Sequence, residues 1–273
     1  MLRLETESGW WLVTHVDHAN LAGAFAEKWG NDLFRAPRPR AQVLKGISRH
    51  DDGWATRDAA PQITRAGKPS AFSVELVGRY SAFEEIDLAD YLAVRDRAVR
   101  LIAEEDAYAA VLVSMHTHNL LTARADRSTI AAAQLPLLDA FLEKQTEFQQ
   151  ELRTRIAADK TLSANEASGQ TITDHFRLLQ ALDNLSLLSC VDYQPPATLL
   201  HPLPLNDGTH RDVSVISVGE RKFRLTPYPF ATDCLAFTFP ARHVEGKIFA
   251  SPEELQKRFA AAPLAQLEVS ISA

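Results

Sequence analysis

The spacing of apolar residues along the chain predicts which segments form strands and which form helices. Residues 2–14 alternate apolar and polar positions around a Ser8-Gly9 turn, which predicts a β-hairpin. Residues 14–190 repeat apolar positions every three to four residues, which predicts helices. Loops are expected between these helices at 30–39, 52–72, 123–130 and 159–170, and one long helix at 130–158.

The pattern changes after Pro195-Pro196, where short alternating segments replace the helical repeat. One helix is expected within this tail, because Ser251-Pro252-Glu253-Glu254 is a capping box with proline at the first helical position. We therefore expect a mainly α protein with a helical domain over 1–193. A small antiparallel β-subdomain is expected over 194–273, and the N-terminal hairpin is expected to join it.

Composition narrows the class of protein without naming a function. Apolar residues make up 46% of the 273 positions and charged residues 23%, which is ordinary for a globular chain. A net charge of -6 gives no electrostatic footprint for duplex nucleic acid or an anionic membrane. No apolar run reaches the ~18–20 residues of a membrane span. Cys190 and Cys234 form no CxxC motif and fit a reducing compartment, so we expect a cytoplasmic protein.

The first candidate functional residue is His18, which lies on the apolar stripe of the first helix. Thr14 opens a T-x-x-D helix-start signature, and His18 then precedes Leu21 and Phe25 on one helix face. His50 and Asp51 follow in the same way, at the end of a helix expected over 41–51 with an apolar stripe. A His and an Asp side by side on an inward-facing last turn can reach one point.

Two later helices each place another such residue on an apolar face. His116 follows Leu112 by four residues, whereas His118 is rotated away from that stripe. Asp183 precedes Leu187 by four residues, and a carboxylate among leucines is costly to bury without compensation. Metal ligation or an ion pair would remove that cost.

Taken singly, each of these residues has a plainer interpretation. A histidine on an apolar stripe is commonly a hydrogen-bonded core residue, and a buried aspartate is commonly a cap or an ion-pair partner. Four successive helices that each turn such a residue inward favour a shared site instead. Imidazole nitrogen and carboxylate oxygen together suit a divalent ion.

The order of these residues resembles the HD superfamily of metal-dependent phosphohydrolases, which has a His, then a His-Asp pair, then a late Asp. HANLAGAFAEKW, which begins at His18, is similar to the first-ligand segment of that superfamily, and ALDNL is similar to the context of its last Asp. The resemblance implies an HD-like helical bundle. The ligands that it implies are His18, His50, Asp51 and Asp183, with His116 as a further ligand and His118 or His175 as weaker candidates for another.

A second resemblance covers most of the chain. DHANLAG and RHDDGW are similar to segments of a bacterial family of unknown function. The chain departs from the well-studied HD enzymes in the long interval between Asp51 and Asp183 and in its β-rich tail. Both departures leave the substrate class open.

The HD resemblance implies one or two divalent ions, with Mn, Mg, Zn, Ni and Fe all compatible. Such an ion lowers the pKa of a bound water toward neutrality. The implied substrate is a small phosphate ester or a nucleotide, and a small phosphorylated molecule is thus the expected partner. Two alternatives remain: a non-catalytic protein that keeps the fold, and an HD-fold di-iron oxygenase.

Four neighbouring residues are candidates for supporting roles. Asp52 could orient the attacking water, or simply end a helix. Trp54 could line the pocket or stack on a base, or pack in the core. Arg65 and Lys68, in the 52–72 loop, could hold a phosphate or face solvent.

Overall fold

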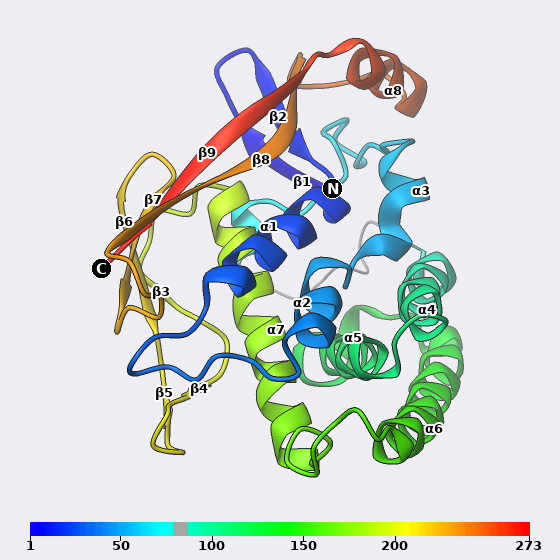
Figure 1. Ribbon diagram of the computed structural model, residues 1–273. Helices are drawn as coiled ribbons and strands as arrows, with labels where there is room; N and C mark the ends of the chain where they lie inside the picture. Colours follow the sequence, from blue (N-terminus) through cyan, green and yellow to red (C-terminus); the bar gives the residue numbers. More distant parts are fainter. Residues whose placement is uncertain (79–86) are drawn as a thin grey trace.

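Helices and a curled sheet form the two halves of the molecule (Figure 1). The computed structural model describes residues 1–78 and 87–273, so residues 79–86 of the expected helical stretch lie outside the described residues. The α-helices are α1 (His15–Lys28), α2 (Arg40–Ser48), α3 (Ala55–Asp58), α4 (Leu88–Ala103), α5 (Ala107–Asn119), α6 (Leu135–Ala158), α7 (Gly169–Cys190) and α8 (Pro252–Ala261). Shorter helical turns are η1 (Asp52–Trp54), η2 (Val74–Leu76), η4 (Leu120–Arg124), η5 (Arg127–Thr129) and η6 (Ala132–Gln134).

The helix starts predicted at Thr14 and Ser251 are confirmed, whereas the helix predicted over 130–158 begins at Leu135. The Thr14 side chain accepts a hydrogen bond from the backbone N–H of Asp17 at the start of α1. Ser251 accepts one from Glu254 at the start of α8. These caps satisfy backbone donors that have no partner inside the helix, and so they fix where each helix begins.

The sheet is built from both ends of the chain. Its order is β1-β2-β8-β9-β7-β6-β3, and a separate pair is β4-β5. The strands are β1 (Leu2–Glu5), β2 (Gly9–Val13), β3 (Ala197–Thr198), β4 (Leu203–Pro204), β5 (His210–Arg211), β6 (Ser214–Gly219), β7 (Lys222–Thr226), β8 (Cys234–Glu245) and β9 (Leu264–Ser272). The N-terminal hairpin joins the sheet by pairing Trp10 with Val244, and β7 pairs with β9 in parallel.

The predicted fold class is therefore wrong. The chain is 49% helical and 20% strand, and its seven-stranded sheet is mixed and large. It is not a small antiparallel subdomain attached to a helical bundle. Local alternation identified strand segments, but the 12-residue β8 and the parallel pairing depend on contacts distant in sequence. The division of the chain at residues 193 and 194 stays a prediction.

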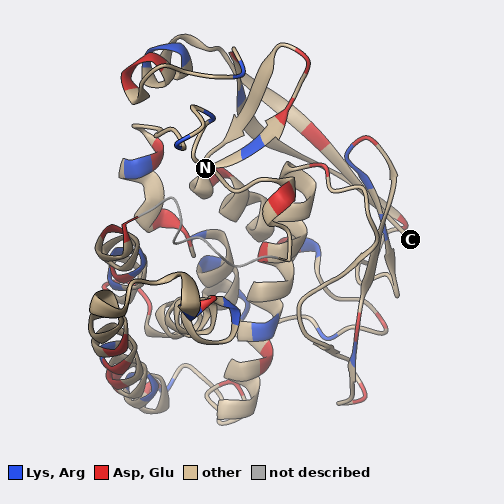
Figure 2. Ribbon diagram, turned by 180° about the vertical axis from the view of Figure 1, so that it is seen from behind, with Lys and Arg blue, Asp and Glu red and all other residues tan. Residues whose placement is uncertain are grey.

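Helices and sheet share one apolar core. Phe25 of α1 packs edge-on against Phe237 of β8 with ring centroids 4.8 Å apart, and the core continues into Leu182 of α7. Outside it, acidic and basic side chains are interspersed along the outer helices (Figure 2). No helix among the described residues is both long and apolar enough to cross a membrane.

Candidate metal centre

Five of the predicted ligand residues lie buried where α1, α5 and α7 meet the end of α2. His18 comes from α1, His116 from α5 and Asp183 from α7. His50 and Asp51 lie just beyond α2, which ends at Ser48, and not in its last turn as the sequence suggested. The exposed fractions are 1% for His18, 0% for His50, 3% for Asp51, 2% for His116 and 7% for Asp183.

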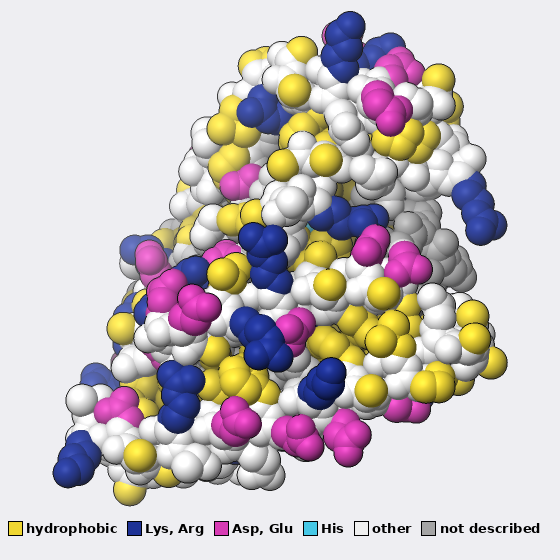
Figure 3. Space-filling model, turned by 90° about the vertical axis from the view of Figure 1, so that its right-hand side faces the viewer, with side chains coloured by type: hydrophobic (Ala, Val, Ile, Leu, Met, Phe, Trp, Pro, Cys, Tyr) yellow, Lys and Arg dark blue, Asp and Glu magenta, His cyan; other side chains and the backbone are white. Residues whose placement is uncertain are grey.

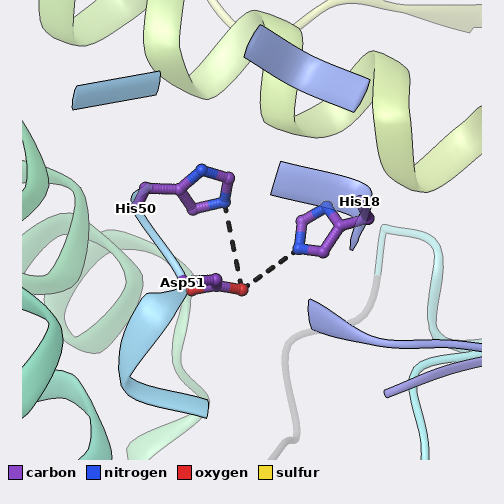
Figure 4. A group of neighbouring side chains, drawn as sticks. All are labelled: His18, His50 and Asp51. Carbon is purple, nitrogen blue, oxygen red and sulfur yellow. Dashed lines mark hydrogen bonds and ion pairs between the residues drawn. The ribbon is translucent and has the colours of Figure 1, made fainter. Parts of the chain in front are cut away.

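Two overlapping groups of side chains place their donor atoms close together. His18, His50 and Asp51 form one group, and His50, His116 and Asp183 form the other; within each group the donor atoms lie within 4.8 Å of one another. Figure 4 shows the first group, with both imidazole rings turned toward the Asp51 carboxylate. Among the described residues, these buried groups are positioned to hold a metal ion.

The distances inside the cluster fit the spacing of ligands around one ion. Asp51 Oδ2 lies 3.1 Å from His18 Nε2 and 3.9 Å from His50 Nε2. Asp183 Oδ1 lies 3.3 Å from His50 Nε2, and Asp183 Oδ2 lies 3.9 Å from His116 Nε2. Bonds of ~2.0–2.2 Å to a tetrahedral zinc ion place its ligand atoms ~3.3–3.6 Å apart, so the observed separations bracket that range.

Hydrogen bonds fix which ring nitrogen faces the centre. His50 Nδ1 donates to the Ile47 carbonyl at 2.7 Å. Ser186 donates its hydroxyl proton to the Asp183 carbonyl at 2.8 Å, so its oxygen accepts from His18 Nδ1 at 2.9 Å. Both histidines therefore carry their proton on Nδ1 and turn Nε2 toward carboxylate oxygens. This is the usual arrangement of a metal-binding histidine and its outer partner.

The metal-free cluster holds a proton where an ion could bind. With its pKa raised to about 9, His50 carries a proton on Nε2, which lies 3.3 Å from the Asp183 carboxylate. A divalent ion between this nitrogen and the carboxylate could replace that proton. His116 Nδ1 is buried without a hydrogen-bond partner among the described residues. The residues thus fit a divalent ion on geometry and on donor type.

Charges in the cluster shift the ionisation of its members. Burial disfavours a charge on His50, but the carboxylates of Asp51 and Asp183 outweigh it and raise its pKa to about 9. Burial lowers the pKa of His116 to about 3. Burial alone would raise the pKa of Asp51, but Arg95 and His50 hold it well below its usual range. Both carboxylates are thus ionised, as ligands must be.

Sequence reasoning missed Arg95, which fixes the Asp51 carboxylate. Its guanidinium Nη1 donates to Asp51 Oδ1 at 2.5 Å, which leaves Oδ2 to face the two histidines. Its Nε donates to the Tyr91 hydroxyl at 3.1 Å, and the Arg95 side chain is 7% exposed. The signal was present, because Arg95 lies on the apolar stripe of α4, seven residues after Leu88.

The cluster opens into a pocket. The cavity has a volume of about 230 Å³, and its lining includes His18, Asp51, Arg95, His116 and Asp183. Further walls come from the residues around α3, from the loop after it and from the second half of α7. Figure 3 shows this side of the molecule, where hydrophobic side chains lie among basic and acidic ones.

The supporting residues predicted from sequence lie in different places. Trp54 lines the pocket but is 2% exposed, with its ring stacked on His15 at 4.2 Å. Asp52 lies outside the lining and accepts from Arg49 Nε at 2.6 Å. The structure also places Arg65 and Lys68 outside it.

Arg65 is exposed, and the Lys68 ammonium lies 5.7 Å from the Trp10 ring centroid. His118 is half-buried and belongs to neither donor group, so the predicted phase of α5 is confirmed. His175 is hydrogen-bonded to the Tyr108 hydroxyl at 2.8 Å, away from the cluster. The roles assigned to these residues stay predictions.

Fold and site together define an α/β protein with a buried His/Asp centre positioned for a metal ion. The chain belongs to the family described as "Protein of unknown function (DUF3891)", whose family model matches residues 1–246. The matched range contains every residue of the centre. Searches of curated proteins and of solved structures found no match.

Proposed function

We propose that this protein is a metal-dependent phosphohydrolase of the HD type, acting on a small phosphate ester. One observation carries the proposal: His18 and His50 both commit Nδ1 to outer partners and turn Nε2 toward buried carboxylates. The chain order of His18, His50-Asp51 and Asp183 supports it, because it matches the order of HD ligands. The ligand set suits several divalent ions, among them Mn, Zn and Fe.

The proposal is for one ion per chain. His50 belongs to both donor groups, and its Nδ1 is bonded to Ile47. Only Nε2 is free to bind an ion, so the two groups cannot each hold a separate ion through His50. His18, His50, Asp51 and Asp183 would hold it, with His116 beside them.

The chain's own residues would then act as follows. Arg95 holds Asp51 Oδ1 and would leave Oδ2 to bind the ion. Ser186 keeps the His18 ring in the tautomer that a ligand needs. When bound, the ion would lower the pKa of a coordinated water and offset charge on a phosphoryl oxygen. The pocket gives a phosphate ester access to that position.

Hydrolysis tests the proposal directly. The full chain, loaded in turn with Mn²⁺, Zn²⁺ and Fe²⁺, is assayed against p-nitrophenyl phosphate, bis(p-nitrophenyl) phosphate and a panel of phosphorylated metabolites. We expect turnover that requires the ion and that His116→Ala weakens by at least about tenfold, the lower end of what a lost partner of a metal site costs. The matched control is His118→Ala, two positions along the same helix and outside the donor groups, which should retain the activity. A loaded wild-type protein that hydrolyses none of these compounds would refute the proposal.

A further inference from the structure

The residues that line the pocket indicate the chemistry of the whole substrate, and not only of the group that reacts. On α7, Asp183 is followed one turn later by Leu187 and Leu188, and all three line the pocket. Leu187 is half-buried, so part of its surface is free to contact a ligand. The cavity therefore runs from the carboxylate of the metal centre onto an apolar helix face.

A second apolar wall comes from the loop after α3. Phe72, Leu76 and Val77 line the pocket and are half-buried. This wall is anchored, because Phe72 pairs with the edge of β1: its N–H donates to the Met1 carbonyl at 2.9 Å and its carbonyl accepts from Arg3 at 2.8 Å. A fixed apolar wall is the kind that selects ligands by shape.

Positive charge for a second phosphate is scarce in the described lining. Arg95 is buried and already paired with Asp51. Arg57 forms no ion pair with a described residue, so it is the lining arginine left for a ligand. The Met1 ammonium also lines the pocket, but it is paired with Asp58 at 2.9 Å and is therefore not free for a ligand. A polyphosphate chain normally needs several cationic donors, so this lining suits one anionic headgroup.

A nucleobase would also lack a stacking surface on Trp54. That ring is 2% exposed, stacked on His15 and covered by the Arg95 guanidinium 5.3 Å from its centroid. The described cavity, about 230 Å³, is smaller than the ~300–1,000 Å³ typical of pockets for drug-sized ligands.

From these observations we infer that the substrate is a compact ester with one anionic group and an apolar body, and not a nucleotide. The anionic group lies at the Asp183 end of the pocket, with Arg57 as the available cation. The apolar body packs between Leu187 and the wall of Phe72 and Leu76. This inference rests on the proposed function, since the metal centre supplies the position of the reacting group.

Binding of non-hydrolysable ligands to the Mn²⁺-loaded full chain tests it. Phenylphosphonate and methylphosphonate share a headgroup and differ in the apolar body, and adenosine monophosphate represents nucleotides. Titration calorimetry should show phenylphosphonate binding at least about tenfold more tightly than methylphosphonate, because the ring removes apolar surface from water. Phenylphosphonate should also bind more tightly than adenosine monophosphate.

Variants of the two walls give the internal control. Leu76→Asn and Leu187→Asn should each weaken phenylphosphonate binding by about tenfold, because each removes apolar contact area. The affinity of both variants for methylphosphonate should equal that of wild type. Leu137→Asn, at a position of α6 that is 46% exposed and outside the lining, should change neither. Equal affinity for the two phosphonates, or tighter binding of the nucleotide, would overturn the inference. Failure of the proposed function is distinguishable, because hydrolysis of phosphate esters is assayed separately from the binding of these non-hydrolysable ligands.

Discussion

Helix α7 buries two aspartates nine residues apart, and their surroundings differ. Asp174 is 5% exposed and Asp183 is 7% exposed. Asp174 Oδ1 accepts from Gln170 Nε2 at 2.9 Å and lies 2.9 Å from His210 Nε2, with Arg177 Nη1 at 3.7 Å. Its hydrogen-bonding needs are met by the protein itself.

Asp183 lies among three buried histidines. Its carboxylate is 3.3 Å from His50 Nε2, 3.8 Å from His18 Nδ1 and 3.9 Å from His116 Nε2. A buried His-Asp contact is therefore no criterion for a metal site by itself. Two groups of three buried His and Asp donors distinguish the Asp183 cluster from the Asp174 network.

A substitution in the Asp183 cluster should reduce ion affinity more than any other change proposed below. His50→Ala should weaken binding of the divalent ion by more than ~100-fold, beyond the ~10–100-fold that loss of an outer partner costs, because it removes a shared donor. Competition with a fluorescent chelator measures this affinity. His210→Ala, the matched change beside Asp174, should leave it unaltered, and a similar loss in both variants would erase the distinction.

Arg95→Met should produce the next largest effect. Ion affinity should fall by ~10–100-fold, because Asp51 Oδ1 loses the donor that orients it. The metal-free variant should also lose ~3–5 kcal/mol of unfolding free energy in chemical denaturation, since a buried carboxylate is left unpaired. Arg100→Met breaks only an exposed pair with Asp96 and should change stability by less than ~1 kcal/mol. Equal stability of the two variants would contradict the role given to Arg95.

Removal of the ion should lower thermal stability. At a free ion concentration of 100 times Kd, binding to the folded state alone adds ~2.7 kcal/mol. Chelation should then lower the Tm of wild type by ~5–10 °C, as measured by differential scanning calorimetry. Chelation should lower the Tm of the Asp174→Asn variant by the same amount. A wild-type Tm that chelation leaves unchanged would count against a bound ion.

A smaller effect concerns pH. The pKa of His50 is raised to about 9 in the metal-free protein, so a proton on this ring competes with the ion below that pH. Affinity should therefore rise with pH between 6 and 9, by at most ~10-fold per unit, with about one proton released per ion near pH 7. Calorimetry in two buffers of different ionisation enthalpy counts that proton. Ion binding without proton release would show that His50 is not a ligand.

Helix phase was the most predictable part of the site. Thr14 caps α1 and turns His18 inward, and the stripe on α5 buries His116 while leaving His118 half-buried. Both follow from helical periodicity, which is local. The position of His50 and Asp51 was harder, because the backbone leaves the helix at Arg49 with φ -119.

The size of the sheet and the role of Arg95 were missed for different reasons. The hairpin was expected to join the tail, but the strand order and the parallel β7–β9 contact join segments distant in sequence, and alternation within each strand could not reveal them. Arg95 lies on the apolar face of its helix, as His18 does. A basic residue on an apolar face needs a partner as much as a carboxylate does, and the partner was Asp51.

Metal content of wild type and two single variants shows whether the Asp183 cluster holds an ion. Wild type, Asp183→Asn and Asp174→Asn are purified without a histidine tag, incubated with Mn²⁺, desalted and analysed by inductively coupled plasma mass spectrometry. Both substitutions keep the side-chain shape and remove a buried charge from the same helix. We predict one ion per chain in wild type and in Asp174→Asn, and none in Asp183→Asn. No ion in wild type, or equal content in the two variants, would contradict the account.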